Sequence, residues 1–197
     1  MSCKSTRRSP EISNSMKQLG HVVWLFGLSG AGKSTLAAAL HEAILPTAPE
    51  GVLMLDGDRL RSGLCRGLGF TDVDREENLR RAAEVARLGV ESGLVVIAAF
   101  ITPREQHRRL IQGIVGEGCL SLVYLAATLE VCRSRDPKGL YAGASAGSVP
   151  QMSGVDSIFD EPEGMHLRLD TGRHDVAECV SALVEFVGRR GIPRSSP

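Results

Sequence analysis

The sequence predicts an α/β protein: a doubly wound, mainly parallel sheet of five strands with helices on both faces and a lid segment. Short apolar runs alternate along the chain with segments whose apolar residues recur at helical spacing, a pattern typical of strand–helix–strand units. At 197 residues the chain suits one domain of this kind, and it shows no internal repeat. The predicted strands are 21–26, 51–55, 94–100, 120–125 and 166–169.

The first strand leads into a glycine-rich segment that matches the G-x-x-x-x-G-K-[ST] phosphate-binding motif in full. An apolar run with β-branched and aromatic residues precedes the motif, and apolar residues at helical spacing from Leu36 to Ile44 follow it. The motif therefore lies at a strand-to-helix turn, which is the structural context it requires. Its residues are Gly27, Leu28, Ser29, Gly30, Ala31, Gly32, Lys33, Ser34 and Thr35.

Each residue type in this loop has a physical task in holding a nucleotide. Glycines allow a close phosphate approach that a Cβ would obstruct, and successive N–H groups at a helix N-terminus bind anionic oxygens. Lys33 is expected to reach the β- and γ-phosphates, and the Ser34 hydroxyl to ligate Mg²⁺, with Thr35 beside it. The alternative, a turn that only tightens a strand–helix connection, does not require a Gly-Lys-Ser triplet at this spacing.

The second predicted strand delivers Asp56, Gly57 and Asp58 to the point where a strand ends and a loop begins. In open parallel sheets, ligands bind beyond the carboxyl ends of the strands. Both carboxylates are therefore expected to point toward the phosphates. The alternative is that the Asp-Gly-Asp sequence only forms a turn.

The remaining elements continue the alternation of strands and helices. A long amphipathic helix is predicted over 74–90, and the strand 94–100 is apolar enough to be central in the sheet. Thr102, Pro103 and Glu105 have the spacing of a capping box with proline at the first helical position, which predicts the start of a helix. Further helices are predicted over 128–135 and 175–190.

The segment 136–164 is rich in Gly, Ser, Ala and Pro and is longer than ordinary connections. We expect it to be a lid, with plain disorder as the alternative. Residues 1–19 are expected to be a disordered arm, 20–191 a single domain and 192–197 a short tail.

Composition argues against several classes of protein. The 23 Lys and Arg residues balance 23 Asp and Glu residues, so no basic excess indicates a nucleic-acid or membrane partner. The five cysteines lack C-x-x-C spacing, which favours reduced thiols and a cytoplasmic protein. No apolar run approaches the roughly 18–20 residues that a membrane span needs, and the five histidines show no metal-ligand spacing.

Several motifs occur in one order along the chain: the phosphate-binding loop, Leu55–Asp58, Leu68–Phe70, Arg75–Arg81 and Arg135–Tyr141. In this combination the chain resembles the adenylylsulfate kinase (APS kinase) family of P-loop kinases over nearly its whole length. The resemblance implies a P-loop kinase fold and transfer of the γ-phosphoryl group of ATP to the 3′-hydroxyl of adenosine 5′-phosphosulfate (APS), which gives 3′-phosphoadenylyl sulfate and ADP. It also implies Mg²⁺ as a cofactor, a homodimer and association with ATP sulfurylase.

Phosphoryl transfer needs charge neutralisation and alignment more than covalent help, which assigns Lys33 and the Mg²⁺ on Ser34 to the donor. Asp58 is the candidate for orienting the attacking hydroxyl and accepting its proton. Asp56 is expected beside the substrate, where it holds a metal-bound water or a loop amide.

An acceptor that carries phosphosulfate is anionic and suits the forked donors of arginine. By similarity to the family, Arg61, Arg75 and Asn78 contact the acceptor. Arg75 and Asn78 are three residues apart and share a helical face, which supports their acting together. The resemblance makes Phe70 one wall of the acceptor's adenine slot, with core packing as the alternative.

The resemblance also assigns Arg135 to ATP and Lys138 to the substrate, both in the lid that excludes water during transfer. Ile101 and Thr102 stand where some bacterial members have an Ile-Ser-Pro triplet with a phosphorylated serine. Thr102 is therefore a candidate phosphate-accepting position and, with Ile101, lines the acceptor pocket. The capping box is the alternative explanation for Thr102.

Two departures from the family pattern favour other functions. Met152 stands where a second aromatic wall is usual, although its sulfur can still pack on a base, and residues 142–145 of the lid carry no charge. One alternative is therefore a P-loop kinase of another small hydroxylated acceptor. The other is a weakly active ATP-binding regulatory module, which would not need Asp58 as a base.

Overall fold

The computed structural model describes residues 20–48, 50–147, 152–155 and 157–190, and within them one five-stranded parallel sheet with the strand order β2-β3-β1-β4-β5. The strands are β1 (His21–Phe26), β2 (Val52–Asp56), β3 (Val95–Phe100), β4 (Leu120–Leu125) and β5 (Leu167–Leu169). The predicted doubly wound parallel sheet is confirmed. The prediction of an arm over 1–19 and a tail over 192–197 lies outside the described residues.

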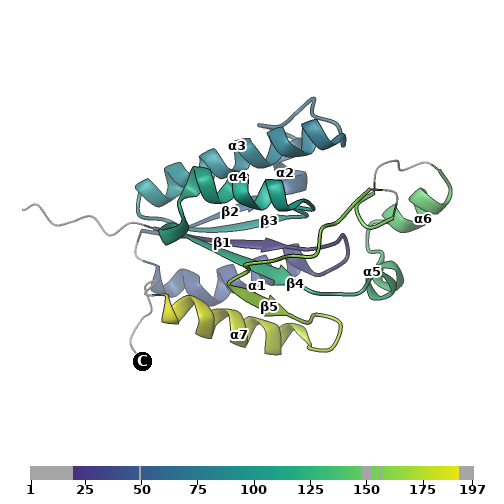
Figure 1. Ribbon diagram of the computed structural model, residues 1–197. Helices are drawn as coiled ribbons and strands as arrows, with labels where there is room; N and C mark the ends of the chain where they lie inside the picture. The colour runs from purple at the N-terminus through teal and green to yellow at the C-terminus, as the bar shows by residue number, and fades with distance from the viewer. Residues whose placement is uncertain (1–19, 49, 148–151, 156, 191–197) are drawn as a thin grey trace, which may run out of the picture.

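Helices cover both faces of this sheet (Figure 1). Helices α3 (Asp72–Glu91) and α4 (Glu105–Val115) pack on one face, and α1 (Lys33–Ile44) and α7 (Val176–Arg189) on the other. Successive side chains of a strand point to opposite faces, so Val22, Trp24 and Phe26 join the α3–α4 core whereas Val23 and Leu25 join the α1–α7 core. This explains why the first strand is apolar at nearly every position.

The strand predicted to be central, β3, lies inside the sheet, but β1 occupies the middle position between β3 and β4. The long helix begins at Asp72, two residues before the predicted start, because the hydroxyl of Thr71 accepts the Asp74 amide hydrogen at 3.1 Å. The short helices α2 (Gly57–Arg61) and α6 (Leu140–Ser145) were not predicted. Helix α5 (Leu129–Arg135) and the 3₁₀ turns η1 (Leu45–Thr47) and η2 (Glu117–Cys119) complete the described elements.

The capping box predicted at Thr102 is wrong. Helix α4 starts at Glu105. Its N-cap residue is Arg104, whose side chain does not cap the helix. Thr102 instead has a left-handed backbone with φ 46°, and its hydroxyl accepts the indole N–H of Trp24. The Glu105 amide donates to the Asp160 carboxylate at 2.9 Å. A distant residue therefore supplies the cap that local spacing assigned to Thr102.

Helix α6 lies between α5 and β5 in the chain. Residues 157–166 lead back to β5 of the sheet, and we call them the return segment.

Among the described residues no helix is both long enough and apolar enough to cross a membrane. The four described cysteines, Cys65, Cys119, Cys132 and Cys179, are free thiols.

Two helical glycines give a matched test of packing. A Cβ built on Gly89 of α3 would lie 2.8 Å from Val96 Cγ2 in the core, whereas a Cβ on Gly113 of α4 meets no atom of the described chain within 4 Å. We expect Gly89→Ala to lower the free energy of unfolding by about 1–3 kcal/mol, because the overpacked core must shift. Gly113→Ala should raise it by up to about 1 kcal/mol through the lower entropy of the unfolded chain. Urea unfolding of both variants measures the difference, and equal shifts would contradict this account.

Candidate active site

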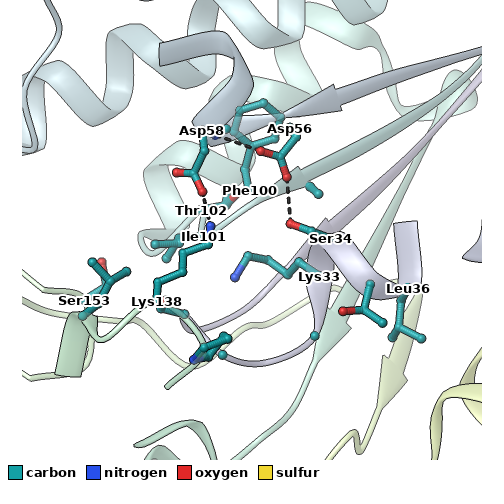
Figure 2. A pocket seen from close by; sticks show the side chains of 18 of the residues that line it. Lys33, Ser34, Leu36, Asp56, Asp58, Phe100, Ile101, Thr102, Lys138 and Ser153 are labelled. Carbon is teal, nitrogen blue, oxygen red and sulfur yellow. Dashed lines mark hydrogen bonds and ion pairs between the residues drawn. The ribbon is translucent and has the colours of Figure 1, made fainter. Parts of the chain in front are cut away.

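The carboxyl ends of the parallel strands meet at one edge of the sheet, where a pocket of about 1070 Å³ opens (Figure 2). The loop between β1 and α1, the end of β2, the segment after β3 and the turn after β5 all contribute to it. Most of the predicted site residues line this pocket: Ser29, Gly30, Gly32, Lys33, Ser34, Thr35, Asp56, Asp58, Arg61, Phe70, Arg75, Asn78, Ile101, Thr102, Arg135, Lys138 and Met152.

Three residues of the phosphate-binding loop do not line the pocket: Gly27, Leu28 and Ala31. The carbonyls of Gly27 and Leu28 instead accept hydrogen bonds from Lys33 Nζ at 3.0 and 2.7 Å. Ala31 is buried, and its carbonyl accepts the Thr171 hydroxyl at 3.0 Å. These three residues therefore stabilise the conformation of the loop through their backbone carbonyls rather than facing the pocket.

The loop has the backbone that an anion site needs. Gly30 has φ 77°, and a Cβ there would lie 2.8 Å from the Cys132 carbonyl oxygen, so only glycine fits. Helix α1 begins after Gly32 with no side-chain cap from any described residue. Its first amides are therefore available to an anion, and the helix N-terminus favours negative charge there.

Lys33 is folded against its own loop, and burial is the main reason why its pKa falls from 10.5 to about 8. The nearby Cys132 partly opposes that shift, and Lys138 adds to it. Phosphate oxygens are the natural partner for a desolvated ammonium, because they replace the water that it has lost. The lysine is thus placed to exchange carbonyl partners for phosphate.

Ser34 and Asp56 join the loop to the end of β2. The Ser34 hydroxyl donates to Asp56 Oδ2 at 2.8 Å, as Figure 2 shows, while Asp56 Oδ1 accepts the amides of Asp58 and Arg59 at 3.0 and 3.3 Å. Asp56 therefore caps α2 through the amides of its first turn, rather than holding an amide of a loop. A hydroxyl and a carboxylate oxygen at this distance are ligands that suit Mg²⁺ beside nucleotide phosphates.

Such a site would share its ion with substrate and water rather than enclose it in protein. In the described part of the chain, no three His, Cys, Asp or Glu side chains cluster as a metal site. Mg²⁺ typically keeps several waters and binds one or two protein groups together with substrate phosphates. Ser34 and Asp56, as two protein groups beside the phosphate-binding loop, fit that pattern.

Asp58 lies on the first turn of α2 and forms an ion pair with Lys138, which follows α5. Figure 2 shows both side chains extending into the pocket from opposite sides. Their side chains are 67% and 54% exposed, so the pair adds little to stability and can exchange for a ligand at small cost.

The other end of the pocket is basic around an exposed aromatic ring. Phe70 is 54% exposed, and the guanidinium carbons of Arg61 and Arg75 lie 4.6 and 5.6 Å from its ring centroid. Both arginines are also anchored to this loop: Arg75 Nε donates to the Phe70 carbonyl at 2.9 Å, and Arg61 donates to Gly69 at 2.7 Å. Because Phe70 is exposed, the alternative of core packing is not observed.

Two residues that line this pocket, Asn78 and Ser153, each have a buried side-chain oxygen with no hydrogen-bond partner among the described residues. Buried polar atoms normally have partners, so these two are available to a bound ligand. Ser153 was not predicted, and its only signal in the sequence is its place next to Met152. Met152 itself is 6% exposed and packs in the α1–α7 core while it lines the pocket.

Thr102 is fully buried, and its hydroxyl accepts the indole N–H of Trp24 at 2.9 Å. Phosphorylation of this hydroxyl would have to displace that bond. Its neighbour Ile101 is half-buried at the pocket wall, and the Ile101 carbonyl accepts the Gly27 amide at 3.3 Å. The segment after β3 is thus hydrogen-bonded to the first residue of the phosphate-binding loop.

Arg135, the last residue of α5, donates to the carbonyls of Gly30 and Thr171. Tyr141 reaches the same loop, where its hydroxyl donates to the Ser29 carbonyl at 2.9 Å. Neither Thr171 nor Tyr141 was predicted as a site residue. The signal for Thr171 was its position in Asp170-Thr171-Gly172, a polar and glycine-rich sequence directly after a strand, like the one after β2.

A parallel sheet that carries a phosphate-binding loop with Lys33 and Ser34, faced by carboxylates at the end of β2, defines a P-loop phosphotransferase. A family model described as adenylylsulphate kinase matches residues 19–170. The chain therefore belongs to the adenylylsulphate kinase family.

Individual relatives agree over most of the chain. It is 47% identical over 169 residues to an adenylyl-sulfate kinase of Geotalea uraniireducens, covering 86% of this chain and 81% of the relative. It is 44% identical over 171 residues to the Prochlorococcus marinus adenylyl-sulfate kinase, covering 85% of each. Among solved structures, the Mycobacterium tuberculosis APS kinase CysC in complex with AMPPNP and APS aligns with a TM-score of 0.81 at 36% identity, over 86% of this chain and 98% of that one.

The pKa of Lys33 gives a prediction for nucleotide binding. Phosphates raise the pKa of a lysine above the value of about 8 in the free protein, so above that pH binding must bring a proton to Lys33. We expect uptake of about one proton per MgATP at about pH 9, with affinity falling by about tenfold per pH unit above pH 8.

Calorimetry in buffers of different ionisation enthalpy measures the proton count. Lys33→Arg is the control, because a guanidinium stays charged throughout this range and needs no added proton. Equal proton uptake by both proteins would contradict the assignment.

The buried bond between Trp24 and Thr102 gives a second prediction. Thr102→Val keeps the shape but leaves the indole N–H without an acceptor, so the free energy of unfolding should fall by about 1–3 kcal/mol. Thr102→Ser keeps the hydroxyl and should change the free energy of unfolding much less. Trp24 is the single tryptophan of the chain, so its fluorescence reports the unfolding of each variant. A valine variant as stable as wild type would show that the bond contributes nothing.

Proposed function

We propose that this protein is an ATP-dependent adenylyl-sulfate kinase, which transfers the γ-phosphoryl group of ATP to the 3′-hydroxyl of APS and so serves sulfate activation. One observation carries the proposal: a single pocket joins a phosphate-binding loop to a basic wall around an exposed aromatic ring. The first feature suits a nucleotide triphosphate, and the second suits an anionic acceptor with a planar base. Membership of the family supports the choice of APS as that acceptor.

On the donor side, the loop amides and Lys33 bind the phosphates of ATP, and Arg135, the last residue of α5, covers the nucleotide. Ser34, with Asp56 beside it, would hold Mg²⁺, and the ion would supply positive charge to the transferred phosphoryl group. Lys33 leaves the Gly27 and Leu28 carbonyls for phosphate oxygens, which restores solvation to its ammonium.

On the acceptor side, Phe70 stacks on the base of APS, while Arg61 and Arg75 bind its phosphosulfate. The unpartnered oxygen of Asn78 is free to accept a hydrogen bond from the ribose or the base. Asp58 orients the 3′-hydroxyl and accepts its proton, a role for which it must give up part of its contact with Lys138. Lys138 then carries its positive charge toward the transferred group as part of the lid over 136–164.

Assembly and location are part of the same proposal. We infer a cytoplasmic homodimer, as the resemblance to the family and the free cysteines suggest. A hexameric APS kinase from Thiobacillus denitrificans is among the similar structures. Association with ATP sulfurylase rests on the family resemblance alone.

A second candidate is a kinase of another small hydroxylated acceptor. Met152 favours it, because a buried thioether offers a base a weaker wall than an aromatic ring does. The decisive assay supplies MgATP with APS, or with other hydroxylated nucleotides and sugars, and measures ADP. Release of ADP that depends on APS is expected. Faster turnover of another acceptor, or no dependence on APS, would overturn the proposal.

The role of Asp58 separates an enzyme from an ATP-binding regulatory module. Asp58→Asn should lower turnover by about 10²–10⁴-fold, because the acceptor hydroxyl loses its base, while affinity for ATP stays unchanged. Glu42→Gln removes an exposed carboxylate of α1 outside the pocket and serves as the control. Full activity of Asp58→Asn would exclude the carboxylate as base.

A further inference from the structure

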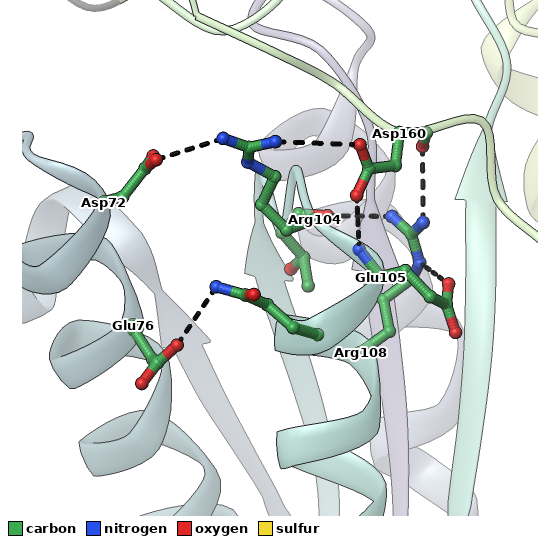
Figure 3. Close-up of polar contacts among 8 residues, drawn as sticks. Asp72, Glu76, Arg104, Glu105, Arg108 and Asp160 are labelled. Carbon is green, nitrogen blue, oxygen red and sulfur yellow. Dashed lines mark hydrogen bonds and ion pairs between the residues drawn. The ribbon is translucent and has the colours of Figure 1, made fainter.

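Helix α4 takes its N-terminal cap from a part of the chain that is distant in sequence. The Glu105 amide donates to Asp160 Oδ2 at 2.9 Å, across 55 residues of sequence, and Asp160 lies on the return segment (Figure 3). The amide of Asp160 donates in turn to the Pro103 carbonyl at 2.8 Å. This residue therefore contacts both the start of α4 and the end of the wall formed by residues 101–103.

A buried arginine strengthens the same junction. Arg108 is 1% exposed and donates to Glu105 at 2.8 Å, to the Thr102 carbonyl at 3.3 Å and to the Asp160 carbonyl at 3.3 Å. A buried guanidinium is costly unless its donors are satisfied, so these contacts constrain the geometry of all three partners. Figure 3 shows the side chain of Arg108 extending from α4 to Asp160 on the return segment.

The wall held by this junction is strained and touches the phosphate-binding loop. Thr102 has φ 46°, a conformation that is unfavourable for a β-branched residue and persists only where surrounding contacts enforce it. Trp24 binds its hydroxyl and Arg108 its carbonyl, while Ile101 accepts the Gly27 amide at 3.3 Å. The contacts thus run without interruption from Asp160 through the wall to the loop.

The junction also reaches the helix that carries Arg75 and Asn78. Arg104 donates to Asp72 at 3.0 Å, at the first residue of α3, and its other terminal nitrogen lies 3.9 Å from Asp160 Oδ1. Figure 3 shows Arg104 between these two carboxylates. The return segment is therefore tied to both structures that face the acceptor end of the pocket.

We propose that Asp160 is a positioning residue for the acceptor: its carboxylate, by capping α4, holds the Ile101-Thr102-Pro103 wall in register with the phosphate-binding loop. The proposal rests on the proposed function for the identity of the acceptor. A residue with a purely structural role would contribute to stability, as a helix cap does, but its loss would leave the kinetics of the folded enzyme unchanged.

The test compares three variants of the full chain below their unfolding temperatures. Asp160→Ala removes the cap, and we expect the KM for APS to rise by about tenfold or more while the KM for ATP stays nearly unchanged, since a displaced wall misplaces the acceptor. Asp160→Asn keeps an oxygen that can cap the helix and should restore most of the affinity for APS. Arg109→Ala is the control, because Arg109 is 76% exposed and pairs with Glu105 without touching the wall.

Hydrogen exchange tests the junction independently of the acceptor. Amides of residues 101–108 should exchange faster in Asp160→Ala than in wild type or Arg109→Ala, whatever molecule the enzyme phosphorylates. If the wild-type protein does not turn over APS, the kinetic comparison is made with the acceptor that it does use. Failure of the proposed function is then distinguished from failure of the role proposed for Asp160. The proposal is overturned if exchange is unaltered, or if Asp160→Ala lowers thermal stability with no change in either KM.

Discussion

The complete burial of strand β1 is the constraint on which the site depends. The strand lies between β3 and β4 with helices on both faces, so the position and direction of its carboxyl end are set by hydrogen bonds on both sides. Gly27 follows it directly and is hydrogen-bonded to Ile101 after β3. The phosphate-binding loop therefore starts from a point that the whole sheet holds in place.

The charged side chains of the site have hydrogen-bond or ion-pair partners that a ligand can replace. Lys33 donates to backbone carbonyls, Asp56 caps a short helix and Asp58 pairs with Lys138. Most of these partners are weak or exposed, so phosphates and an acceptor hydroxyl can replace them at small cost. The arrangement keeps the groups oriented, yet leaves them free to bind a ligand.

The departures from the family pattern are Met152, which lines the pocket, and residues 142–145, which do not. Met152 is buried in the α1–α7 core, whereas Phe70 is exposed beside two arginines, so the two residues would offer an acceptor base unequal surfaces. Arg135 at the end of α5 and Tyr141 in α6 nevertheless reach the loop, where both donate to backbone carbonyls. Contacts of that kind do not depend on the charge of residues 142–145.

What the sequence by itself determined is local: the strand, glycine loop and helix around Lys33, and the strand–helix alternation that predicts the sheet. These features depend on residues that are close in the chain, where periodicity and backbone preference act directly. Only the tertiary structure decided which residue caps α4, because Asp160 is 55 residues from Glu105 and no local spacing encodes that contact. The same holds for Asp58 with Lys138 and for Arg135 with Thr171, pairs that meet because parallel strands bring their carboxyl ends to one edge.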